Sequence, residues 1–148
     1  VNWLFLPSGL RLLFVLVLAH TGAIGIMLGT ALINYAFGAP EHSHAYNLLT
    51  ALISGGSPYL ARFMAVHFLQ LNTQLDGLTS KNFFKISVLF ALTSSLLHQV
   101  WFFWSGKTDD LITNTLVMAV GDWFGTVLVL ASASLVIHTI KSFAQMKH

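Results

Sequence analysis

The chain of 148 residues has no cysteine and very few charged residues. Without cysteine it can form no disulfide, no thiolate metal site and no thiol nucleophile. Charged residues make up 8% of the chain, against about 25% in soluble domains, and 55% of the residues are hydrophobic. The few basic residues form no cluster or arm, so nucleic-acid binding is not expected. This composition indicates an integral membrane protein.

Long apolar runs recur along the chain, and about 18 consecutive apolar residues are enough to cross a bilayer as a helix. The strict alternation of a transmembrane barrel is absent. Five apolar segments can be drawn, at residues 4–20, 22–38, 46–71, 83–104 and 111–140. We therefore expect an all-α fold, a polytopic transmembrane helical bundle of about five segments. It would form one integral membrane domain over residues 1–148, in contact with the lipid bilayer.

Two of these segments contain helix-breaking sequence. Pro7 is followed by Ser-Gly near the start of the first segment, and Pro58 follows Gly-Gly-Ser in the middle of the third. Proline inside a helix removes a backbone hydrogen bond and clashes with the preceding turn. We expect broken half-helices near Pro7 and Pro58, each with an electropositive N-terminus. Arg11 and Arg62 follow these breaks about one turn later.

The lysines predict an orientation in the membrane. Lys81 and Lys85 lie between the third and fourth segments, and Lys141 and Lys147 follow the fifth. Because cytoplasmic loops are enriched in lysine and arginine, we expect the C-terminus to be cytoplasmic. The acidic loop at residues 106–110 would then lie outside.

Asp122 is a lone carboxylate within the apolar stretch 111–140. A charge near the centre of a membrane helix costs about 3 kcal/mol on insertion scales, so it needs a partner or a function. Arg11 and Arg62 are the expected partners. Three interpretations stay open: a pairing that neutralises charge and holds the helices in register, a pocket for a small anionic or polar ligand as in transporters with broken helices, or a proton relay.

Two G-x-x-x-G motifs, Gly25 with Gly29 and Gly121 with Gly125, predict close helix packing. This spacing places both glycines on one helix face, which lets another backbone approach. We expect packing inside the bundle, with contact to another protein as the alternative.

Histidines in or near the apolar segments could ligate haem or a pigment. They are His20, His67, His98 and His138. A single histidine per helix is more often hydrogen-bonded to a neighbouring helix, so no cofactor is predicted. His42 and His44 beside Glu41 are a poor metal signature, and no metal site is predicted. The sequence offers no nucleophile–base pair, phosphate loop or paired carboxylates, so we expect no catalytic residue and no enzymatic activity.

Three motifs occur in a particular order: residues 6–10 (LPSGL), residues 25–34 (GIMLGTALIN) and residues 121–125 (GDWFG). This order resembles the integral membrane-associated sensor domains of the first MASE type. In that family the domain usually precedes a histidine kinase or a diguanylate cyclase. The resemblance implies a bundle that receives a signal, in a bacterial inner membrane.

No output domain is expected after residue 140. Our first hypothesis is therefore a non-enzymatic, sensor-like membrane protein that acts through a separate partner protein. The alternatives are an accessory structural subunit of a larger membrane complex, energy-transducing or pigment-bearing, or a small transporter component.

Overall fold

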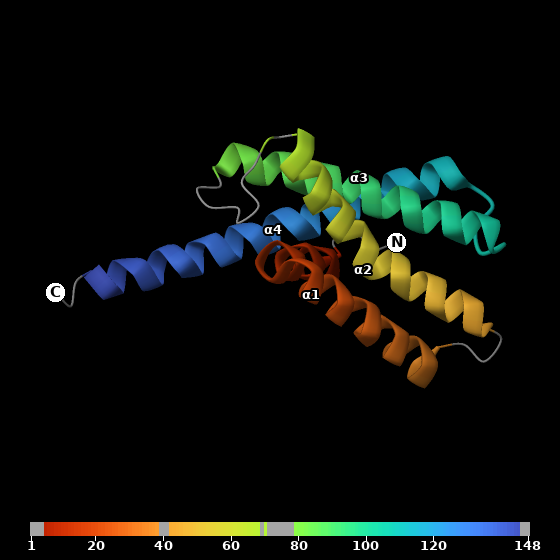
Figure 1. Cartoon of the computed structure of the whole chain (residues 1–148). Helices are drawn as coiled ribbons and strands as arrows, with labels where there is room; N and C mark the ends of the chain where they lie inside the picture. Colours follow the sequence, from red (N-terminus) through yellow and green to blue (C-terminus); the bar gives the residue numbers. More distant parts are fainter. Residues whose placement is uncertain (1–4, 39–41, 69, 71–78, 146–148) are drawn as a thin grey trace.

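The computed structural model describes residues 5–38, 42–68, 70 and 79–145, which form four α-helices (Figure 1). They are α1 (Leu6–Phe37), α2 (His44–Phe68), α3 (Ser80–Trp104) and α4 (Leu111–Gln145). Three stretches are long and apolar enough to cross a membrane: α1, α3 and Leu111–Val136 of α4. An all-helical fold with helices of membrane-spanning length is therefore confirmed. The described residues form four helices rather than five segments.

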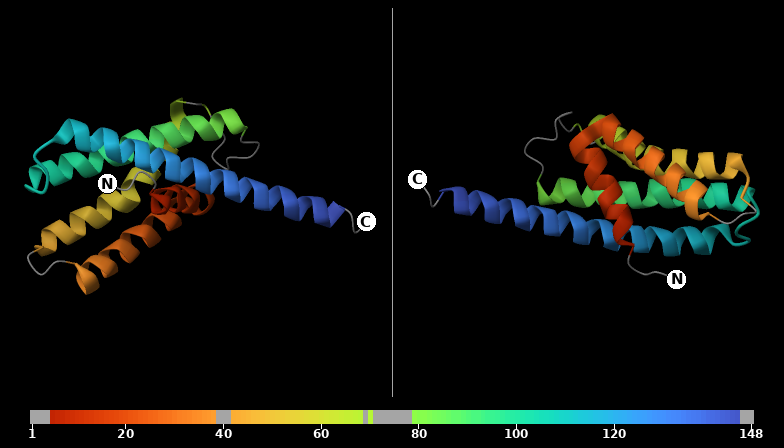
Figure 2. Two further views of the ribbon diagram at one scale, coloured as in Figure 1. Left: turned by 180° about the vertical axis from the view of Figure 1, so that it is seen from behind. Right: turned by 90° about the horizontal axis from the view of Figure 1, so that it is seen from below.

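The first two expected segments form one helix, α1, with a sharp bend at Ala19. Ala19 has φ 51° and ψ −125°, a conformation that residues other than glycine rarely adopt. Just after the bend, Gly22 packs against the preceding arm, where a Cβ atom would lie 2.5 Å from the carbonyl oxygen of Phe14. Figure 2 shows the two arms of α1 running in different directions. The boundary expected near residues 20–22 thus corresponds to a kink at Ala19, where two helical arms of α1 meet and the backbone leaves the helical conformation.

The two prolines lie at positions that a helix tolerates. Pro7 occupies the first turn of α1, where its missing N–H would have no intrahelical partner anyway. Pro58 lies inside α2, which continues from His44 to Phe68, so the half-helix expected near Pro58 does not form. Neighbouring helices can compensate for a proline in a membrane helix, and buried Pro58 lies in the interior of the bundle. Figure 1 shows that α2 bends instead of ending.

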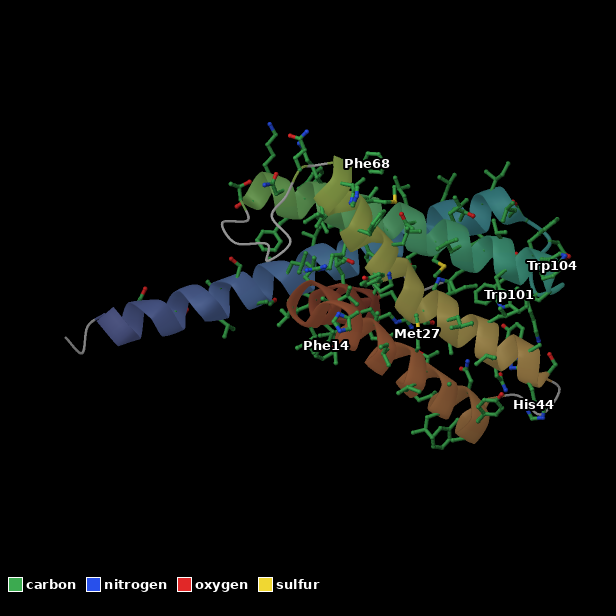
Figure 3. All side chains as sticks on the ribbon, viewed as in Figure 1. Phe14, Met27, His44, Phe68, Trp101 and Trp104 are labelled. Atoms are coloured by element: carbon green, nitrogen blue, oxygen red, sulfur yellow. The ribbon has the colours of Figure 1, made fainter. Side chains whose placement is uncertain are left out.

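The helices pack mainly as a ring, in which α1 and α3 each contact both α2 and α4. One part of the core is an apolar cluster to which every helix contributes. Its buried members are Leu12, Leu16, Ala61, Ala65, Ile86, Phe90 and Leu130. Met27 of α1 packs on Gly55 of α2 (Figure 3), where a Cβ atom would lie 2.5 Å from the Met27 Cγ atom.

Polar side chains fill the other part of the core. The buried ones on the four helices include Ser8, Ser54, Ser57, Ser94, Ser95, His98, Gln99, Asp122 and Thr126. The two kinds of residue concentrate at different levels: on α4, for example, Asp122 is followed two turns later by Leu130, although on α3 buried Ser87 lies beside Ile86. The core therefore has a polar layer and an apolar layer, while the outer surface carries exposed Leu, Ile, Val and Phe side chains.

The start of α1 docks against the middle of α4. The backbone N–H of Phe5 donates to the carbonyl oxygen of Gly121 at 3.2 Å. The hydroxyl of Ser8 lies 3.0 Å from the backbone carbonyl oxygen of Asp122 and 2.7 Å from that of Phe5, so it bridges the two helices. Figure 2 (right) shows the first arm of α1 meeting α4 part-way along its length.

The two G-x-x-x-G motifs have different surroundings. A Cβ atom at Gly125 would collide with the carbonyl oxygen of Phe5, and one at Gly9 would lie 2.6 Å from the carbonyl oxygen of Gly125. Gly25 and Gly29 have nothing within 4 Å of such an atom. The internal packing expected at all four glycines therefore occurs at Gly125 and at buried Gly121, which the Phe5 backbone contacts, whereas no described atom lies within 4 Å of a Cβ at Gly25 or Gly29.

The end of the bundle that carries the α3–α4 loop is rich in tryptophan. Trp101 and Trp104 lie there, at the end of α3 (Figure 3). The indole N–H of Trp101 donates to the hydroxyl oxygen of Thr50 on α2 at 3.0 Å. Tryptophan is enriched where a membrane meets water, so this end suits a membrane surface.

We predict that Gly125→Val destabilises the protein by about 1–3 kcal/mol, because the added side chain has no room beside Phe5 and forces the start of α1 away from α4. Gly29→Val makes the same chemical change where nothing lies nearby, and should change stability by less than about 0.5 kcal/mol. Reversible unfolding of the purified variants in detergent measures both. If Gly125→Val and Gly29→Val lost the same amount of stability, the docking of α1 on α4 described above would be contradicted.

A second prediction concerns Asp110, which caps α4 by accepting a 3.0 Å hydrogen bond from the backbone N–H of Thr113. Hydrogen bonds from the Thr113 side chain and backbone hold the pKa of Asp110 below its ordinary value of 3.8. A carboxyl group with a lowered pKa stabilises the fold above its unfolded pKa, and this contribution is lost as the pH falls through the folded pKa. Asp110→Ala should therefore destabilise the protein at neutral pH, and its difference from wild type should decrease as the pH falls below 3.8 and through the lowered pKa of the folded state.

Thermal unfolding against pH measures this difference, with Asp109→Ala as the control for removing an exposed neighbouring charge. A difference between wild type and Asp110→Ala that persists unchanged in acid would rule out the capping carboxylate as its cause.

Candidate functional site

Asp122 lies in the polar layer with only 1% of its surface exposed. The hydroxyl groups of Ser8 on α1 and of Ser94 and Ser95 on α3 act on its carboxyl group, although those of Ser94 and Ser95 have no hydrogen-bond partner among the described residues. Arg11 on α1 is the cation that acts electrostatically on it. Hydroxyl groups can donate to a carboxylate, and a nearby cation favours its charged form. These groups offset part of the cost of burying a charge inside the bundle.

The structure places the two arginines differently. Arg11 follows the docked start of α1, and its guanidinium carbon lies 5.7 Å from the centre of the Phe5 ring, within the range of a cation–π contact. Arg62 lies on α2 next to Ala61 of the apolar cluster. Of the two expected partners, the structure therefore brings Arg11 to Asp122.

His98 connects α2 and α3 in the same polar layer. Its Nδ1–H donates to the carbonyl oxygen of Ser94 at 2.8 Å. Because a carbonyl oxygen can only accept, the hydrogen is on Nδ1, and Nε2 accepts from the Ser54 hydroxyl at 3.4 Å. Both ring nitrogens are thus occupied by hydrogen bonds between protein groups.

The other candidate histidines lie elsewhere. His20 is exposed on α1, and exposed His67 stacks on Phe63 with ring centres 4.2 Å apart. The side chain of His138 lies outside the described residues. Within the part of the chain that the structure describes, no three His, Asp or Glu side chains gather as a metal site would require.

Of the polar-layer residues named above, six have a buried oxygen with no hydrogen-bond partner among the described residues. Four are the hydroxyl oxygens of Ser57, Ser94, Ser95 and Thr126, and the other two are Asp122 Oδ2 and Gln99 Oε1. The amide nitrogen of Gln99 is engaged, since it donates to the sulfur of Met118 at 3.4 Å. Leaving a buried polar atom unpaired costs about 1–3 kcal/mol, and such an atom in a folded protein calls for a water, an ion or a ligand.

Asp122 and Gln99 line a common cavity of about 310 Å³ between α3, α4 and the start of α1. The full lining is Phe5, Gln99, Asn114, Val117, Met118, Gly121 and Asp122. Exposed Asn114 donates a hydrogen bond from its amide nitrogen to the hydroxyl of Thr108 in the α3–α4 loop. The cavity therefore opens beside that loop, at the tryptophan-rich end of the bundle.

A larger cavity, of about 510 Å³, lies between α3 and α4 at the level of the apolar layer. Phe83, Phe84 and Leu130 line it, and the hydroxyl of Ser87 at its wall donates to the Phe84 carbonyl oxygen of its own helix. This surface suits hydrocarbon chains. The smaller cavity, with its carboxylate, is the chemically distinctive one.

Sequence reasoning identified Asp122 and Arg11 but overlooked Ser94, Ser95 and Gln99. A signal for them was present, because polar residues three and four apart in an apolar segment share one helix face. Ser94, Ser95, His98 and Gln99 have this spacing on α3, and all are buried. Their common face points at the polar layer.

No protein-family model, curated protein or solved structure matches this chain. The function is therefore argued from the geometry of the site.

We predict that Arg11 and Asp122 are energetically coupled. Each single substitution, Arg11→Met or Asp122→Asn, leaves the other group without its counter-charge in a low-dielectric interior. The double variant should therefore be more stable than the sum of the two losses implies, by about 0.5–3 kcal/mol. Unfolding of the four proteins in detergent gives this difference.

The matched control pairs Asp122→Asn with Lys85→Met, which removes an exposed cation on α3. In this control pair, the losses in unfolding free energy of the two single variants should add up to the loss in the double variant. Simple additivity for Arg11 and Asp122 as well would show that the two charges do not interact.

Proposed function

We propose that this protein is a non-enzymatic, sensor-like integral membrane protein that binds a small polar ligand beside Asp122 and acts through a separate partner protein. One observation carries the proposal: a carboxylate oxygen without a hydrogen-bond partner lies at the wall of a cavity that opens beside a loop. Charge neutralisation of Arg11 alone would require neither the cavity nor the exposed polar residue at its mouth. A binding site accounts for both.

The position of the cavity suggests how ligand binding acts on the fold. Phe5 and Gly121 line the cavity, and the hydrogen bond between their backbones holds the start of α1 on α4. A ligand that contacts Phe5 and Asp122 would bind more tightly to one position of α1 on α4 than to another. A difference in affinity for two conformations shifts the equilibrium between them. The bend at Ala19 would carry this change into the second arm of α1.

On this proposal the second arm of α1 meets the partner. Gly25 and Gly29 present an uncovered face, and small residues allow another membrane helix to approach closely. From the lysine distribution and the family resemblance, we place the protein in a bacterial inner membrane with a cytoplasmic C-terminus. The mouth of the cavity would then face the outside.

The same uncovered face favours a second candidate function, an accessory structural subunit of a larger membrane complex. Leu28 and Leu32, beside the two glycines, are 67% and 72% exposed. An accessory subunit would use this face permanently, and Asp122 would then serve only the fold.

Photo-crosslinking in membranes separates the two candidates. A benzoyl-phenylalanine placed at Gly29 should crosslink a partner, whereas one placed at Val17, on the exposed side of the first arm, should not. For a sensor-like protein, Asp122→Asn should change the yield at Gly29, because it alters the ligand site, at a temperature where the variant, although less stable, is still folded in detergent.

An accessory subunit should instead show the same yield and the same stoichiometry in wild type and Asp122→Asn after purification in mild detergent. If the only effect of Asp122→Asn is to unfold the protein, then the role of Asp122 is to neutralise the charge of Arg11. If no partner is crosslinked or co-purified, both candidates are wrong.

A further inference from the structure

The cavity beside Asp122 presents hydrogen-bond acceptors at its buried end. Asp122 Oδ2 and Gln99 Oε1 are buried and have no partner among the described residues, and both residues line the cavity. The amide nitrogen of Gln99 is directed to Met118, and that of Asn114 is directed to Thr108. Each amide nitrogen thus gives one of its two N–H groups to a protein partner, which fixes the orientation of the amide and turns its oxygen away from that partner.

The charged and titratable groups near the cavity leave room for a cation. Arg11 on α1 interacts with Asp122 through space, but it contacts the ring of Phe5 and is not part of the cavity lining. On α3, His98 uses both ring nitrogens for Ser94 and Ser54. Of the described residues that line the cavity, none carries a positive charge.

The remaining walls also suit a cation with an alkyl part. Phe5 contributes an aromatic ring, whose face attracts cations. Met118 contributes a polarisable thioether, which adapts to irregular ligands, and Val117 contributes an apolar surface. A carboxylate, amide oxygens and an aromatic ring together form the kind of lining that holds an organic ammonium group.

We propose that the cavity binds a small organic ammonium ion, whose N–H groups donate to Asp122 Oδ2 and Gln99 Oε1 while its alkyl part packs on Phe5, Val117 and Met118. This assignment rests on the proposed function and names its ligand class. An anionic ligand, which the broken-helix interpretation of the sequence allowed, would meet the carboxylate and is disfavoured.

The absence of native cysteine makes a direct test feasible. Val117→Cys places a single thiol in the cavity wall without removing an acceptor, and Lys107→Cys places one on the exposed α3–α4 loop. The rate of alkylation by a small maleimide is measured for each protein in nanodiscs. The probes are n-butylammonium, n-butanol, butyramide and NaCl, at matched ionic strength for the salts.

We expect saturating n-butylammonium to slow alkylation of Val117→Cys by at least ~10-fold, because an occupied cavity excludes the reagent, and to leave Lys107→Cys unchanged. Adding Gln99→Met removes one acceptor for a charged donor and should weaken the apparent affinity by ~10-fold or more. Adding Asp122→Asn should abolish protection. If Asp122→Asn does not fold, the Gln99→Met result decides.

Equal protection by n-butanol or butyramide would overturn the ammonium assignment in favour of a neutral ligand, and equal protection by NaCl would overturn it in favour of an inorganic cation. Protection by a dialysable extract of the source cells, without protection by n-butylammonium, overturns the ammonium assignment but leaves ligand binding intact. If neither the extract nor any probe protects Val117→Cys, the ammonium assignment and the proposed ligand binding both fail.

Discussion

A helix that begins inside a membrane protein has backbone N–H groups with no partner in its own first turn, and hydrocarbon offers them none. α1 begins in this situation, against the middle of α4. The N–H of Phe5 finds the carbonyl oxygen of Gly121, and Ser8 bridges to the backbone of Asp122. The glycine at 125 makes this contact close enough, because any side chain there would meet the Phe5 carbonyl group. The position of α1, and with it one wall of the cavity, depends on this docking.

The two layers of the core can also be explained by the hydrocarbon of the membrane that surrounds the helices. Because lipid is as apolar as leucine, burying leucine gives little reason for helices to associate, and close packing with polar contacts has to contribute more. The apolar layer around Phe90 supplies close packing, with Ala61 and Ala65 keeping it compact. The polar layer around Asp122 and His98 supplies contacts between helices. The cavity lies in the polar layer, where hydrogen-bonding groups are already concentrated.

Much of the fold could be read from composition and hydropathy, but the number of segments could not. Local sequence treats Pro58 as a helix break, yet buried packing lets α2 pass through it as a bend. The region around His20 looks like a boundary between two spans, and two helical arms do meet there at a kink, but the direction in which the second arm leaves Ala19 could not be predicted. Both outcomes depend on neighbouring helices, which a local pattern does not contain.

Only part of the candidate site could be predicted from the sequence. The cost of a lone charge marks Asp122 and predicts an arginine partner, but the choice of Arg11 over Arg62 depends on which helix lies against α4. The serines and Gln99 have a common helical face, which spacing indicates without showing what that face meets. Likewise the two G-x-x-x-G motifs are identical as patterns, but the backbone of Phe5 lies against Gly121 and Gly125, whereas nothing lies close to Gly25 and Gly29.

The sequence by itself determined that this is an all-helical protein with helices of membrane-spanning length, because hydropathy and charge content depend on residues one at a time. It also determined that the charge of Asp122, in an apolar segment, needs a partner or a function. The tertiary structure alone decided what lies around Asp122: Arg11, the docked start of α1 and a cavity shared with Gln99. These are relations between side chains on three helices, far apart in the chain, which meet only once the helices have packed.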